Sequence, residues 1–263
     1  MFSFYFRKVV SSPVTLISAV ILFLALLFSS VSMSGDIFES LGGPLYSFQY
    51  VCAVGIVYYF LPVVTALPIC YIQYEMITKK AECFFLYRSR PKRYIFSGIA
   101  AAGISGAVVT LISFALFIGY CTATGGASLM SQVLHEFEGT CFANASARVL
   151  YLREAFVFAC NGALWPVIAF TIFCFTKNQY IATAAPLILR SGGTYIIQRI
   201  SYHIDATELT ILDYIDSTMI KGEGSIGNFS DSGIMYIVLY VTAAIIICTV
   251  LSCLKMHRRR VYG

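Results

Sequence analysis

The sequence predicts an all-α polytopic membrane protein. Three observations support this fold class: the composition, the long uncharged apolar segments and the uneven distribution of charge. Of the 263 residues, 59% are hydrophobic and only 12% are charged, and the mean hydropathy is +0.79. A soluble domain carries about 25% charged residues, so this chain has too little polar surface to cover a water-soluble core. We therefore expect a single transmembrane domain over residues 1–263.

Six segments have the length and apolar content of membrane-spanning helices, which need about 20 apolar residues each. The expected spans cover about residues 13–33, 48–74, 94–120, 154–176, 179–197 and 234–254. Pro62 and Pro68 are expected to kink or break the second span, as membrane bundles tolerate. The fifth span has the weakest pattern, because Pro186, Arg190 and the pair Gly192–Gly193 interrupt it.

Basic residues gather on one side of the predicted bilayer, and acidic residues gather on the other. With six alternating spans and a cytoplasmic N-terminus, most basic residues are cytoplasmic: Arg7, Lys8, Lys79, Lys80, Arg88, Arg90, Lys92, Arg93, Lys177, Lys255, Arg258, Arg259 and Arg260. Of the acidic residues, only Glu75 and Glu82 share that side. Because basic loops stay in the cytoplasm, we expect both termini there and the protein in the plasma membrane.

Two cytoplasmic segments mix apolar residues with basic ones. Residues 1–12 are typical of a short helix lying in the membrane interface, or of a plain cationic flank that sets orientation. The loop from Glu75 to Arg93 carries basic residues on both sides of the apolar run Cys83–Tyr87. This pattern favours an amphipathic helix that docks on a partner protein, or one that rests on the membrane surface.

Two further helical patterns concern packing. Apolar residues recur at helical spacing over residues 206–220, which predicts an outer amphipathic helix between spans five and six. Span three contains Gly98, Ala102 and Gly106 at intervals of four. Small residues on one face let two helices approach closely in lipid. We expect this stripe to pack inside the chain or against a second subunit.

The cysteines and histidines show no pattern of a metal or catalytic site. Most of the nine cysteines lie in apolar runs, where Cys acts as a small hydrophobic residue. Only Cys121 and Cys141 fall in a segment expected on the outer side, and a disulfide between them is a hypothesis. The sequence contains no GxxxxGK[ST] nucleotide loop and no HExxH motif. We expect no catalytic residue, metal or cofactor on this chain.

Arg190 is the charge expected deepest in the predicted membrane. In a straight fifth span it would lie about 20 Å above the cytoplasmic end, in the outer leaflet. An ionisable group at that depth is a candidate functional residue. The structural alternatives are that Arg190 snorkels outward or pairs with Glu154 to fix the bundle.

The order of these elements resembles the permease subunits of bacterial type-2 ABC transporters, whose ATPase is often a separate protein. Phe4–Pro13 looks like that family's basic N-terminal helix, which ends in Ser-Pro and enters span one. Glu75–Tyr94, ending in Leu-Tyr-Arg-Ser-Arg-Pro-Lys-Arg-Tyr, looks like its loop between spans two and three. The glycine-rich start of span three and the long outer segment before span six are also similar.

The resemblance implies that the chain is the membrane-spanning permease subunit of an ATP-driven exporter. Its loop between spans two and three would carry a coupling helix that fits into a cytoplasmic ABC ATPase, where ATP binds. A second permease subunit, identical or related, would complete the path through the membrane lipid, and no nucleic acid is expected as a partner. The residues implied for coupling are Glu75, Lys79, Lys80, Phe84, Phe85, Tyr87, Arg88, Arg90, Lys92 and Arg93.

The alternative is a non-transporting six-helix membrane scaffold or assembly protein, in which the basic loop only orients the chain. A secondary carrier lacks support, because the sequence shows no internal repeat and no acidic residue at the midplane of a span.

Overall fold

The structure is a computed structural model, and it describes residues 2–34, 48, 51–52, 56–79, 91–125, 147–203 and 232–262. The regular elements in these ranges are helices: α1 Phe2–Val10, α2 Pro13–Ser34, α4 Val57–Thr78, α6 Pro91–Gly125, α8 Ala147–Thr176, α9 Gln179–His203 and α11 Ser232–Tyr262. No strand occurs in the same ranges. The prediction of an all-α protein is therefore confirmed for the described part of the chain.

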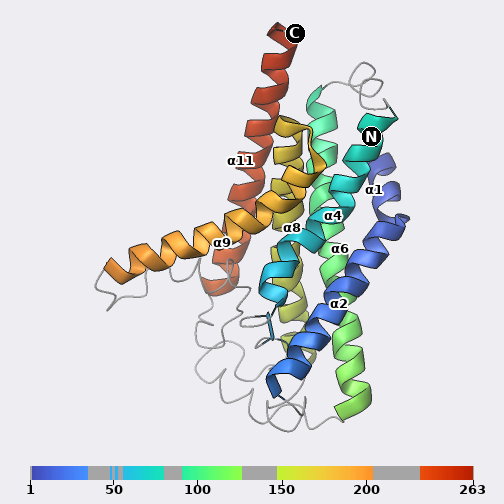
Figure 1. Cartoon of the computed structure of the whole chain (residues 1–263), viewed down its shortest axis with the longest axis vertical. Coiled ribbons are helices and arrows are strands. Elements are labelled where there is room, and N and C mark those ends of the chain that lie inside the picture. The colour runs from blue at the N-terminus through green and yellow to red at the C-terminus, as the bar shows by residue number, and fades with distance from the viewer. Residues whose placement is uncertain are drawn as a thin grey trace.

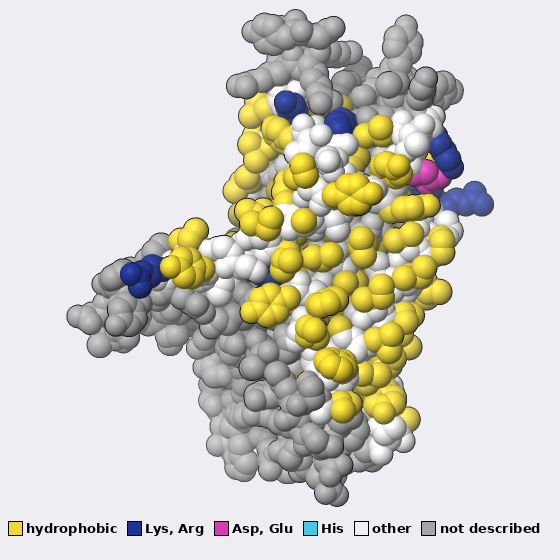
Figure 2. All heavy atoms as spheres, in the orientation of Figure 1, with side chains coloured by type: hydrophobic (Ala, Val, Ile, Leu, Met, Phe, Trp, Pro, Cys, Tyr) yellow, Lys and Arg dark blue, Asp and Glu magenta, His cyan; other side chains and the backbone are white. Residues whose placement is uncertain are grey.

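Five of these helices form an elongated bundle, and each is long and apolar enough to cross a membrane: α2, α4, α6, α8 and α11 (Figure 1). Hydrophobic side chains cover most of the visible face of the bundle, and basic side chains lie near the end where α1 is found (Figure 2). We call this end the α1 end. A surface of this kind is solvated by acyl chains. The protein is embedded in a membrane.

The fifth predicted span, residues 179–197, differs from the other five. It is helical and continues to His203 as α9, but it is not among the helices apolar enough to cross a membrane. In Figure 1 α9 is strongly inclined to the bundle, and its second half extends beyond it. The straight-span height of about 20 Å for Arg190 is therefore an overestimate, because an inclined helix rises less per residue. A sixth crossing stays a prediction.

Helix boundaries differ from the predicted spans at several points. Helix α8 begins at Ala147, seven residues before the predicted start at Glu154, so its first turns include charged residues. Helix α4 remains one helix from Val57 to Thr78 with Pro62 and Pro68 inside it. The two prolines therefore do not break the helix, since neighbouring helices in a bundle support a span with lost backbone donors.

The bundle interior contains two apolar clusters. One lies towards the α1 end and includes Tyr5 from α1, Ile69 from α4 and Phe170 from α8. The other lies farther from that end and includes Leu22 and Phe117. Helix α11 contributes least to the interior, since only 17% of its apolar segment is buried, compared with 72% for α8. One side of α11 therefore faces the surroundings of the bundle.

Candidate functional site at the junction of α1, α4 and α6

Helix α1 is fixed to the bundle by its apolar face. Its sequence places Tyr5 and Val9 one helical turn apart, and both side chains are fully buried against α4 and α6. Arg7, on another face, is exposed. An amphipathic helix of this kind suits the membrane interface. In this structure the buried side of α1 packs against α4 and α6.

A buried hydrogen-bonded triad joins three helices at this junction. Gln73 of α4 donates from Nε2 to the hydroxyl oxygen of Tyr5, at 3.1 Å. The hydroxyl of Tyr94, in the first turns of α6, donates to Gln73 Oε1 at 3.0 Å. The rings of Tyr5 and Tyr94 pack edge to face, with centroids 6.1 Å apart. One amide group therefore uses both ends to hold α1 and α6 against α4.

An ion-paired group lies beside the triad, at the end of α4. Glu75 Oε2 accepts from Lys8 Nζ of α1 at 2.9 Å, and its other carboxylate oxygen pairs with Lys79. The hydrogen bond that Lys79 donates to the Glu75 carboxylate raises the pKa of Lys79. Both pairs are partly exposed, so each adds little stability by itself. The pair with Lys8 holds the last turn of α4 in position against α1, and the pair with Lys79 orients the Glu75 carboxylate within α4.

The residues implied for coupling are only partly described. Glu75 and Lys79 belong to the ion-paired group, and Lys92 and Arg93 are exposed in the first turn of α6. The remaining ones lie outside the described residues: Lys80, Phe84, Phe85, Tyr87, Arg88 and Arg90. The predicted docking loop is therefore attached to the junction at both ends, directly after α4 and directly before α6.

Sequence reasoning did not identify Gln73, Tyr5 or Tyr94 as site residues. The signal was present for Gln73, because an amide in an apolar segment needs hydrogen-bond partners when it is buried. Its partners were not predictable. Tyr5 is 68 positions and Tyr94 is 21 positions away in sequence.

Replacing Gln73 with leucine is expected to loosen α1 from the bundle. The substitution removes both hydrogen bonds of the triad from a buried site, which costs about 1–3 kcal/mol. Hydrogen–deuterium exchange should show faster exchange in α1 and unchanged exchange in α11. The triple variant Gln73→Leu, Tyr5→Phe, Tyr94→Phe is the control. It removes the hydroxyls as well, so it should recover most of the lost protection. Unchanged exchange in α1 of the single variant would contradict this role.

The small-residue stripe of span three faces α8. A Cβ atom on Gly98 would collide with the ring of Phe170, and one on Gly106 would collide with the carbonyl oxygen of Gly162. Ala102, between them, is fully buried. The two backbones therefore approach each other closely where Gly106 meets Gly162, as small residues permit in membrane helices.

A second group of polar residues is buried in the bundle, in and near the half of α8 that lies away from the α1 end. Arg153 and Glu154 are buried and form an ion pair. Arg190 of α9 is only 1% exposed, and its guanidinium lies 5.7 Å from the ring centroid of Trp165. Arg190 is thus buried and does not snorkel outward.

The predicted disulfide involves one described cysteine. Cys121 lies buried near the end of α6 that is away from the α1 end, whereas Cys141 lies outside the described residues. Pairing between them remains a prediction. Among the described residues, no group of three or more His, Cys, Asp or Glu side chains is arranged to hold a metal ion.

Comparison with known proteins identifies no relative. The chain matches no family model, no curated protein and no solved structure. The function of the chain is therefore inferred from the geometry of the junction and from the pattern of the sequence.

Proposed function

We propose that this chain is the permease subunit of an ATP-driven exporter and couples to a separate cytoplasmic ATPase through the loop from Glu75 to Arg93. The observation that carries the proposal is the junction. Gln73 and Glu75 tie the last turns of α4 to α1, and Gln73 also ties α4 to Tyr94 at the start of α6. The two helices that flank the loop are thus held in one block with α1.

A block of this kind suits the transmission of force. A partner that pushed on the loop would act on α4 and α6 together, because the triad resists their separation. Helix α6 meets α8 along Gly98 and Gly106, where close packing leaves no space for independent movement. Displacement of the loop would then reach α8, which carries the buried charges Arg153 and Glu154.

Charge supports a protein partner at this end. Lys79, Lys92 and Arg93 are exposed around the loop. Together with Arg88 and Arg90 they give the loop region a strongly basic character, which favours an acidic docking surface. In this proposal ATP binds to the partner, a second permease subunit completes the path, and the assembly resides in the plasma membrane. The free energy of transport comes from the partner's ATP hydrolysis.

The test is a charge-reversal experiment on the intact chain, purified in mild detergent from the cells that make it. The wild-type protein should co-purify with a P-loop ATPase that mass spectrometry identifies and that hydrolyses ATP. Replacing Arg88, Arg90 and Arg93 with glutamate should reduce recovery of that ATPase about tenfold or more, because like charges would then face the acidic surface. Both proteins must first reach the membrane at equal levels.

The matched control is the reversal Arg258→Glu, Arg259→Glu, Arg260→Glu, which makes the same change in charge in the predicted cytoplasmic tail. It should recover the ATPase as the wild type does. Equal recovery with both triple variants would contradict docking at the loop. If no ATPase accompanied the wild type, the scaffold alternative would replace the exporter.

A further inference from the structure

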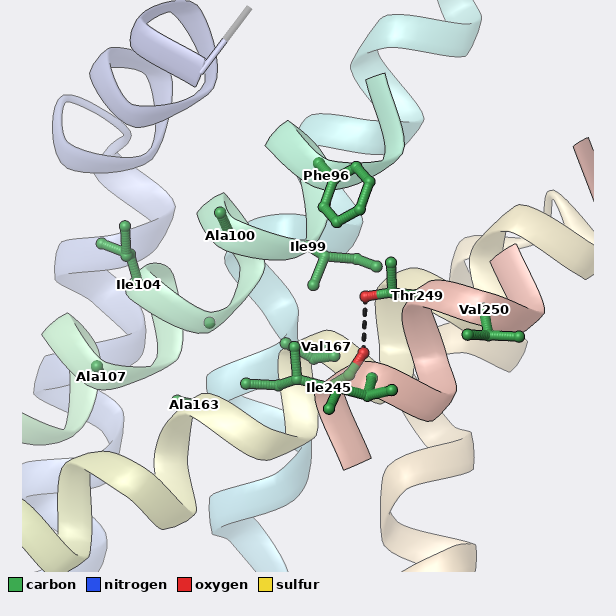
Figure 3. Close-up of a pocket in the computed structure, with 12 residues that line it drawn as sticks. Phe96, Ile99, Ala100, Ile104, Ala107, Ala163, Val167, Ile245, Thr249 and Val250 are labelled. Atoms are coloured by element: carbon green, nitrogen blue, oxygen red, sulfur yellow. Dashed lines mark hydrogen bonds between the residues drawn. The ribbon is translucent and has the colours of Figure 1, made fainter. Parts of the chain in front are cut away.

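An apolar groove of about 760 Å³ lies between α6, α8 and α11, on the face of α6 away from α2 and α4 (Figure 3). Phe96 lines one end of it and Ala107 lies towards the other. Val167 of α8 and Ile245 of α11 line it from the opposite helices. A volume of this size is within the range of small-molecule sites.

The side chains that line the groove do not require a polar ligand. Among the described residues that line it, Thr249 is the single one with a polar side chain, and its hydroxyl donates to the carbonyl oxygen of Ile245 at 2.7 Å (Figure 3). The remaining lining is aliphatic, aromatic or glycine. The groove therefore fits hydrocarbon, because water in it would find no described side chain to bind other than the hydroxyl oxygen of Thr249.

The groove is open to the surroundings of the bundle. Phe96, Ile246 and Val250 line it and are each more than half exposed. In a membrane the surroundings at this depth are lipid acyl chains. A chain could thus enter from the side without any rearrangement of the helices.

The length of the groove corresponds to one leaflet. Phe96 and Ala107 are eleven residues apart on α6, which at 1.5 Å per residue is about 17 Å. Half of a hydrocarbon core of about 30 Å is 15 Å. The groove therefore accommodates an acyl chain along most of its length in the leaflet nearest the α1 end.

Two basic residues precede the Phe96 end of the groove in the sequence of α6. Lys92 and Arg93 precede Phe96 by about one helical turn. On a helix they therefore lie next to the row formed by Phe96, Ala100 and Ala107, which lines the groove. Both are exposed. Basic residues at the end of a groove between membrane helices are typical of sites for anionic lipid headgroups.

We propose that the groove between α6, α8 and α11 binds one acyl chain of an anionic phospholipid, whose phosphate contacts Lys92 and Arg93. The apolar lining holds the chain, and the two cations select the charge of the headgroup. This site does not depend on an ATPase, so it stands or falls separately from the exporter proposal.

The test uses native mass spectrometry of the full-length protein released from nanodiscs of equal parts phosphatidylglycerol and phosphatidylcholine. One phosphatidylglycerol molecule per chain should remain bound in preference to phosphatidylcholine. Lys92→Glu should reduce that preference about fivefold or more, since one cation near the surface contributes about that factor. The substitution is at an exposed position and does not disturb packing.

Filling the groove with a larger side chain should abolish retention of phosphatidylglycerol and of phosphatidylcholine alike. A Cβ on Gly103 would meet only Val167, at an ordinary 3.7 Å, so Gly103→Leu should fold and place its side chain in the groove. Ala100→Phe, at an exposed lining position, provides a second filling variant. Leu111→Phe enlarges an exposed residue of α6 outside the groove and should retain the wild-type lipid.

Equal retention of the two lipids by the wild type would overturn the proposal, as would a preference unchanged by Lys92→Glu. Retention of the lipid by both filling variants would also overturn it. If the wild type were released as a lipid-free dimer and Gly103→Leu were monomeric, a second copy of the chain would occupy the groove in place of lipid.

Discussion

Replacing Glu154 with leucine is expected to destabilise the protein by about 3–5 kcal/mol, the cost of removing one partner of a buried ion pair. Glu154 is 3% exposed and pairs with Arg153, which is also buried. The substitution would remove the carboxylate from a buried pair and leave the guanidinium of Arg153 without it, in a medium that screens charge poorly.

The single tryptophan of the chain reports on this region directly. Trp165 is buried, donates from Nε1 to Asn161 Oδ1 at 3.0 Å, and has the guanidinium of Arg190 over its ring. Its fluorescence should shift at a lower temperature in Glu154→Leu than in the wild type. The double variant Arg153→Met, Glu154→Leu should lose less stability than Glu154→Leu alone, because it removes both partners of the pair. An unfolding temperature unchanged in the single variant would show that the pair does not hold the interior together.

Replacing Gly106 with leucine is the second change expected to have a large effect. A Cβ there would overlap the carbonyl oxygen of Gly162 and come within 2.6 Å of Cγ of Pro166. The obstacle is backbone, which cannot rotate away as a side chain can. Helices α6 and α8 would have to separate, at a cost of about 3 kcal/mol or more. The expected result is early thermal loss of the monodisperse peak in size-exclusion chromatography.

Gly119 provides the matched control for this substitution. It lies on the same helix, and a Cβ there would meet nothing within 4 Å. Gly119→Leu should therefore melt as the wild type does, or slightly higher, because leucine is a better helix former than glycine. If Gly106→Leu and Gly119→Leu were equally stable, the close approach of α6 to α8 would be wrong.

The sequence by itself determined the membrane character and the main helices. Apolar composition and segment length are sums over neighbouring residues, so α2, α4, α6, α8 and α11 follow from local sequence. The interval between Gly98 and Gly106 marked a face for close packing in the same local way. Boundaries were less accurate where charge interrupted a helix. Because charges are usually excluded from spans, Arg153 and Glu154 led to a predicted start that omits the first turns of α8.

Only the tertiary structure decided which side chains meet. The triad of Tyr5, Gln73 and Tyr94 joins three helices that are far apart in the sequence. The burial of Arg190 follows from the inclination of α9 against α4 and α8, which no property of its own residues specifies. The groove beside α11 exists because that helix leaves part of α6 uncovered. Periodicity gives the face of a helix, but the partner of that face depends on how all the helices pack together.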